Sequence, residues 1–134
     1  MDKELFKVVY SNGQLPDPSG VDTSSIVEDL WEAYVDSSSS LLNELEGAAM
    51  DYEAGRDQDE KAASIRRILH TLKGEAGMTG VMDIHNLCHE AETAFDKITD
   101  QAVAADMVLK VKDWIVAAIE YACGKERTNV TDDF

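Results

Sequence analysis

The chain has 134 residues, 44% apolar and 29% charged, and its 12 basic against 27 acidic residues leave a net charge of −15. This length predicts a single domain whose core needs no disulfide or structural metal. So acidic a surface repels phosphate groups, which excludes nucleic acid and membrane surfaces as expected partners. No apolar run resembles a signal peptide or membrane span, and Cys88 and Cys123 lie in apolar helical patterns, so we expect a cytoplasmic monomer.

Residues 1–22 are predicted to form an irregular N-terminal arm. They contain both prolines of the chain, Pro16 and Pro18, and a turn signal at residues 11–13. Residues 126–134 are predicted to be a frayed C-terminal tail. The domain body is expected between these ends, at residues 23–125.

Four segments of the body have helical periodicity, at about residues 24–52, 57–76, 82–98 and 101–123. Asp57 stands at capping-box spacing from Glu60, Asp100 is placed to cap the fourth helix, and Gly124 is placed to end it. No alternating strand pattern competes with these helices. Their short connections predict an all-α fold, an up-down antiparallel four-helix bundle.

The second helix carries a basic strip, residues 61–74, within this acidic protein. These fourteen residues carry +4, so the remaining 120 carry −19. Two interpretations remain open. The strip binds an anion, or it is a solvated face whose cations pair with carboxylates of neighbouring helices.

His70 lies off the apolar stripe of this helix, near its boundary with solvent. Arg66, Lys73, Gly74 and Gly77 lie within about 60° of it around the helix axis. Each glycine costs about 1 kcal/mol of helix stability and leaves bare backbone beside the imidazole, which would let a second protein come close. The alternative is that the glycines fray the helix end, which explains Gly77 better than Gly74.

The third helix places Glu92 at the same level as His70. A short turn near residue 80 makes the two helices antiparallel, so residues whose numbers sum to about 160 face each other. A carboxylate that accepts a hydrogen bond from one imidazole nitrogen fixes the tautomer and makes the other nitrogen nucleophilic. Glu92 is predicted to do this with His89 orienting it, and Lys73 to supply positive charge for a phosphoryl group. The pattern predicts reversible phosphorylation of His70.

The stretch His70-Thr-Leu-Lys-Gly-Glu-Ala-Gly-Met-Thr-Gly80 resembles the signature of histidine phosphotransfer (HPt) domains. The later Leu87-Cys-His-Glu-Ala-Glu92 narrows the resemblance to the amino-terminal phosphotransfer domain of chemotaxis-type histidine kinases. The resemblance covers roughly residues 25–123. It departs from the chemotaxis pattern at Glu75, where a small residue is usual, and at Thr79 and Val81, where phenylalanine is common.

The resemblance implies that His70 is phosphorylated, Lys73 lies on the phosphate side, Gly74 is a required small position, and His89 and Glu92 support the site. Gly77 and Arg66 would assist them. It implies a phosphocarrier, not an enzyme by itself, that exchanges phosphoryl groups with a histidine kinase domain and a response-regulator receiver aspartate. No cofactor is implied, and magnesium is expected only on the receiver. The chemotaxis-type motif favours an origin within a larger kinase.

Two other functions remain open. His85 and His89 are four residues apart and Glu92 follows, a spacing that can hold a metal ion on one helix face, with His70 across the groove. Lys73 beside such a site would oppose a cation. The other alternative is a protein-interaction bundle in which His70 is never phosphorylated.

Overall fold

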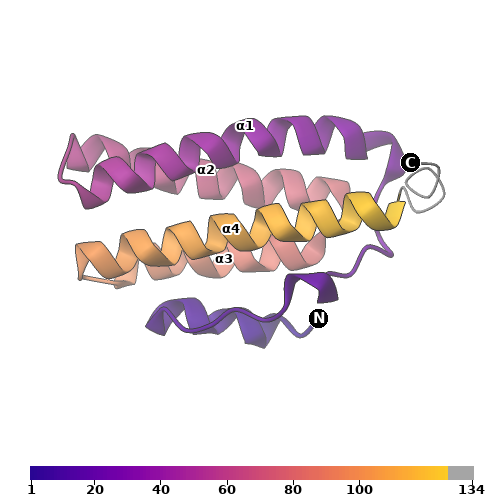
Figure 1. Ribbon diagram of the computed structural model, residues 1–134, viewed down its shortest axis with the longest axis horizontal. Helices are drawn as coiled ribbons and strands as arrows, with labels where there is room; N and C mark the ends of the chain where they lie inside the picture. The colour runs from indigo at the N-terminus through magenta and orange to yellow at the C-terminus, as the bar shows by residue number, and fades with distance from the viewer. Residues whose placement is uncertain (127–134) are drawn as a thin grey trace.

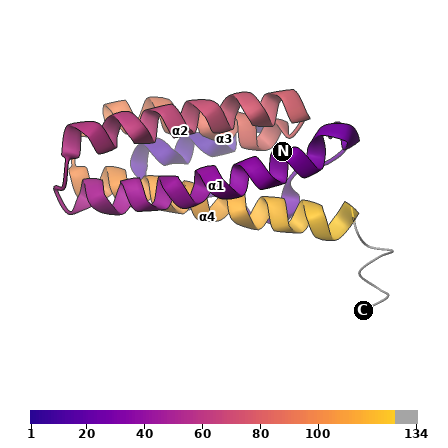
Figure 2. The ribbon, with the colours of Figure 1, turned by 90° about the horizontal axis from the view of Figure 1, so that it is seen from above.

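The computed structural model describes residues 1–126, which form four long helices (Figure 1). These are α1 (Glu28–Glu53), α2 (Gln58–Thr79), α3 (Met82–Lys97) and α4 (Gln101–Glu126). Each packs against the next along the chain, and α4 closes back on α1, so that the helices occupy the four corners of a bundle (Figures 1 and 2). The predicted all-α four-helix fold is confirmed. Within the described chain no helix is long and apolar enough to cross a membrane.

The helix ends follow the predicted signals only in part. Asp100 caps α4 as predicted, because its Oδ1 accepts hydrogen bonds of 3.0 and 3.2 Å from N–H groups of the first turn. Asp57 makes no capping bond, since the turn holds it at φ 45°, outside the extended conformation from which a cap side chain reaches the helix. Gly124 does not end α4, which continues to Glu126.

The N-terminal arm is present, but much of it is helical rather than irregular. It contains two 3₁₀ helices, η1 (Lys3–Ser11) and η2 (Pro18–Gly20). Asp2 caps η1 by accepting a 2.9 Å hydrogen bond from the backbone of Glu4. Phe6 and Val9 lie three residues apart, one 3₁₀ turn, so both side chains face the bundle and are buried.

The arm covers an outer face of the bundle. Helix η1 packs on α3 and η2 on α4. The Phe6 ring meets Trp114 edge-to-face with 5.4 Å between centroids, and the Trp114 indole N–H donates a 2.6 Å hydrogen bond to the carbonyl of Pro16. Burial of Phe6, Val9 and Val21 holds the arm against the body, so these residues of the arm extend the core.

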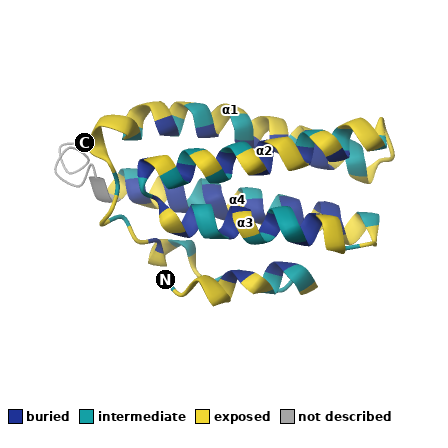
Figure 3. Cartoon of the chain, turned by 180° about the vertical axis from the view of Figure 1, so that it is seen from behind, coloured by how far each residue is buried: buried dark blue, intermediate teal, exposed yellow. Residues whose placement is uncertain are grey.

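The core lies between the four helices, whose buried residues concentrate on their inner sides (Figure 3). Cys88 is fully buried there, and burial raises the pKa of its thiol to about 12, consistent with a structural rather than a reactive cysteine. The largest fully buried side chains are Phe6, Val9, Leu45, Ile65, Ile68, Leu69, Leu72, Val81, Ile84, Leu87, Met107 and Ile115.

The turn between α2 and α3 is tied to the start of α1. Gly80 ends α2 at φ 92°, and a side-chain carbon at this position would collide with the carbonyl oxygen of Ser25. Next to it, the backbone N–H of Val27 donates a 2.7 Å hydrogen bond to the carbonyl of Thr79. The predicted tail at 126–134 lies, beyond Glu126, outside the described residues.

Candidate functional site

His70 lies on the outer side of α2 because the opposite side of that helix is the core. Ile65, Leu69 and Leu72 are fully buried against the neighbouring helices. The His70 side chain remains 68% exposed. The amphipathic pattern of α2 therefore presents this imidazole to solvent and to any incoming protein.

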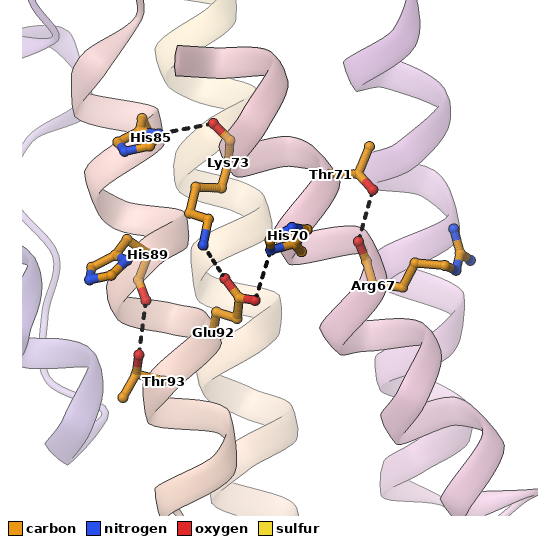
Figure 4. A network of polar contacts seen from close by, with 8 residues as sticks. All are labelled: Arg67, His70, Thr71, Lys73, His85, His89, Glu92 and Thr93. Carbon is orange, nitrogen blue, oxygen red and sulfur yellow. Dashed lines mark hydrogen bonds and ion pairs between the residues drawn. The ribbon is translucent and has the colours of Figure 1, made fainter. Parts of the chain in front are cut away.

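Glu92 on α3 joins the two polar side chains of this face of α2 (Figure 4). Its Oε1 lies 3.1 Å from Nδ1 of His70, and its Oε2 lies 2.8 Å from Nζ of Lys73. The geometry agrees with the level expected from an antiparallel hairpin. The carboxylate is thus held from both sides, with each oxygen engaged by one residue of α2.

The environment of Glu92 keeps it ionised and sets the tautomer of His70. Partial burial acts to raise the pKa of this carboxyl, but the hydrogen bond and charge of Lys73, followed by those of His70, lower it overall. An ionised carboxylate only accepts hydrogen bonds, so Nδ1 of His70 carries the proton. In this tautomer the nitrogen lone pair that can react is on Nε2, and the His70 side chain that carries it is exposed.

His89 does not join this cluster. Its ring is directed away from Glu92 (Figure 4) and lines a polar hollow between α3 and the arm, together with Lys3 and Lys7. Three residues along a helix correspond to a rotation of about 60°, and here that rotation carries His89 toward η1 while Glu92 faces α2. His89, which was predicted to orient Glu92, does not face this carboxylate, and the side chain that contacts it beside His70 is Lys73.

The cations of the basic strip are paired with neighbouring helices. Arg66, predicted to assist the site, donates a 2.6 Å hydrogen bond to Asp96 and stacks over the Phe95 ring, away from Glu92. This favours the interpretation of the strip as a solvated, ion-paired face. The four pairs, each within 4.0 Å, are Lys61 with Asp51, Arg66 with Asp96, Arg67 with Glu44, and Lys73 with Glu92.

The two helical glycines near His70 have different surroundings. At Gly74 no atom lies within 4 Å of the position that a Cβ would take, so this stretch of α2 is open. At Gly77 a Cβ would lie 3.1 Å from Nδ1 of His85. Gly74 therefore leaves room for a partner beside His70, whereas Gly77 leaves room for a side chain of α3.

The residues of the metal alternative are not brought together. Nδ1 of His85 lies 3.0 Å from the backbone carbonyl of Lys73, Glu92 is engaged by α2, and His89 faces the arm. Among residues 1–126, no group of three histidine, cysteine or acidic side chains is arranged to hold a metal ion.

A hollow on the α1 side of α2 was not predicted from the sequence. Met78 is 73% exposed and, with Leu30 and Glu75, lines a hollow between α1 and α2. The hydroxyl of Ser37 donates to both oxygens of Glu75, at 2.8 and 3.0 Å. The available signal was Glu75 itself, which departs from the family pattern, but its partner on α1 is remote in sequence.

The comparisons agree with this geometry. The family model for the Hpt domain matches residues 29–121. A gliding motility regulatory protein of Myxococcus xanthus is 30% identical over 97 residues, which make up 69% of this chain and 12% of that protein. The chain thus spans only a small part of this relative's length, and no solved structure matches. Because the family match covers more than half of the chain, the protein belongs to the Hpt domain family, phosphocarriers that transfer phosphoryl groups on histidine in phosphorelays.

Proposed function

We propose that His70 is the phosphorylated residue and that its Nε2 is the reacting atom. The observation that carries this proposal is the hydrogen bond between Nδ1 and Glu92, which leaves the Nε2 lone pair available on a side chain that is 68% exposed. In the forward step Nε2 forms a bond to phosphorus while the bond from phosphorus to the donor's leaving atom breaks. The positive charge that develops on the ring is stabilised by the Glu92 carboxylate.

In the onward step a receiver-domain aspartate attacks phosphorus, the N–P bond breaks, and the imidazole returns to its neutral form. Lys73, now 2.8 Å from Glu92, is one helical turn from His70 and is the cation available to the phosphoryl group. The donor would be a histidine kinase domain, and the motif at residues 87–92 supports a kinase of the chemotaxis type. The exchange would take place in the cytoplasm.

The direct test is to map the phosphoryl group on the unaltered protein. Incubation with phosphoramidate, a small-molecule donor to histidine, should give one phosphohistidine that is labile in acid and stable in alkali. Peptide mapping should place it on His70, and addition of a receiver domain should remove it. A label on His85 or His89, or none where another Hpt domain is labelled, would contradict the proposal.

Gly74 and Gly47 form a matched pair that tests the docking surface. Both are exposed helical glycines with no atom within 4 Å of the Cβ position, but only Gly74 is beside His70. Replacing either by glutamine is expected to stabilise its helix by roughly 0.5 kcal/mol. Gly74→Gln should also slow transfer to a receiver at least about tenfold, because its side chain fills space that the partner must occupy.

The measurements are urea unfolding and rapid-quench transfer from phosphorylated protein to a receiver. Labelling by phosphoramidate, which needs no docking, should stay within about twofold for both variants. Equal transfer rates for Gly74→Gln and Gly47→Gln would place the receiver contact elsewhere on the bundle.

A further inference from the structure

His85 makes an unusual contact with the helix that carries the site. Its Nδ1 lies 3.0 Å from the backbone carbonyl oxygen of Lys73, twelve residues away on α2 (Figure 4). A carbonyl only accepts, so Nδ1 donates the proton. Within an α-helix such a carbonyl already accepts from the N–H four residues ahead, and His85 uses its second lone pair.

The imidazole of His85 packs against the backbone of Gly77. A Cβ at Gly77 would be 3.1 Å from Nδ1 and 3.6 Å from Cε1 of His85, so a side chain there would displace the imidazole by a few tenths of an ångström from its position on the carbonyl. A glycine inside a helix costs about 1 kcal/mol relative to alanine, and contact with His85 gives that cost a structural reason. Glycine at 77 and histidine at 85 therefore belong to one arrangement.

The contact acts on a residue that is held at both ends. The carbonyl of Lys73 is bound by His85, and its ammonium group is bound by Glu92, which in turn accepts from His70. Lys73 and His70 belong to α2, whereas His85 and Glu92 belong to α3, so all three contacts join these two helices. A slip of one residue along an axis displaces a side chain by about 1.5 Å, which is enough to break a hydrogen bond of 3.1 Å.

We propose that His85 is a positioning residue of the phosphotransfer site. It sets the position of α2 against α3 through the Lys73 carbonyl, so that Glu92 meets Nδ1 of His70 and keeps the Nε2 lone pair available. This inference rests on the proposed function of His70. His85 itself makes no contact with the reacting atoms.

Two replacements of nearly equal shape separate the hydrogen bond from packing. Asparagine places an amide N–H close to the position of Nδ1, whereas leucine has no donor. His85→Leu is expected to lower labelling of His70 by phosphoramidate about tenfold, a typical cost of losing an outer partner of a reactive group. In the same variant the ¹⁵N signals of the His70 ring should move toward a mixture of tautomers. His85→Asn should remain within about twofold of the unaltered protein in both measurements.

Gly77→Ala is a second, independent variant, because it displaces the ring while favouring the helix. It should also lower the labelling rate and shift the His70 signals, with circular dichroism showing a folded bundle. Unchanged ¹⁵N signals and labelling in His85→Leu or Gly77→Ala would overturn the proposal, as would equal losses in His85→Leu and His85→Asn. Failure of the unaltered protein to be labelled would instead count against His70 as the phosphorylated residue, and the ¹⁵N measurement would still test the positioning role.

Discussion

Replacement of His70 with glutamine is expected to abolish phosphoryl acceptance and leave the bundle folded. A glutamine amide has no nucleophilic lone pair on nitrogen, so no bond to phosphorus can form. The His70 side chain is 68% exposed, and its partner Glu92, which is 26% exposed, stays bonded to Lys73 when His70 is replaced. The free energy of unfolding should therefore change by less than about 0.5 kcal/mol. Labelling with phosphoramidate and urea unfolding measure the two effects.

His89→Gln is the matched control for this experiment. His89 is exposed, like His70, but its ring faces the arm rather than Glu92. Its replacement should leave labelling within about twofold. A large loss in His89→Gln would restore the sequence-based prediction that His89 orients Glu92. Label retained in His70→Gln would require another phosphorylated residue.

Replacement of Gly80 with alanine is expected to reduce the free energy of unfolding by about 2–4 kcal/mol, combining backbone strain with a steric clash. At φ 92° an L side chain is strained whatever the space around it. The added Cβ would also collide with the Ser25 carbonyl oxygen, which belongs to the backbone and moves only if the entry to α1 moves. Urea unfolding followed by circular dichroism measures the loss.

Gly55→Ala separates the two contributions. Gly55 has a similar φ of 77°, but no atom lies within 4 Å of its Cβ position. This variant should lose only the conformational term, about 1–2 kcal/mol. Equal losses at Gly55 and Gly80 would show that the approach of Ser25 to the α2–α3 turn contributes nothing to stability.

The effects expected for His70→Gln and Gly80→Ala both concern the pair of helices α2 and α3. Gly80 sets the turn from which α2 and α3 descend as an antiparallel pair, and His70 and Glu92 meet across that pair. The site has few polar parts, and Glu92 links them by holding the imidazole with one oxygen and the lysine with the other. A carboxylate shared in this way holds the ring proton of His70 on Nδ1 without burying the side chain, so Nε2 stays accessible to a partner.

Helical periodicity was enough to predict the meeting of His70 and Glu92. The rise and twist of an α-helix are constant, and a short turn leaves two helices little choice but to pack antiparallel. The same local geometry predicted that His70 would lie off the core stripe and that Asp100 would cap α4. These features depend on neighbours in sequence, or on one turn, and the amino-acid pattern therefore carries them.

The side-chain contacts of the site and of the basic strip could not be predicted from helical periodicity. His89 and Glu92 lie on neighbouring sides of α3, and the packing of that helix against α2, α4 and η1 decides which of them faces α2. The cations of the basic strip suggested an anion site, but Arg67 is paired with Glu44 of α1, remote in sequence. Helix end-points also differed where a glycine kept a helical backbone, as at Gly124.

By itself, then, the sequence determined the all-helical class, the level at which His70 faces α3, and the family resemblance around that histidine. Only the tertiary structure decided that Lys73 rather than His89 contacts Glu92. It also decided that Gly74 faces open space while Gly77 lies against the ring of His85, and that the arm covers α3. The physical reason is the range of the interactions involved. Helix formation follows from local backbone geometry, whereas the rotation of each helix is chosen by the packing of the whole core.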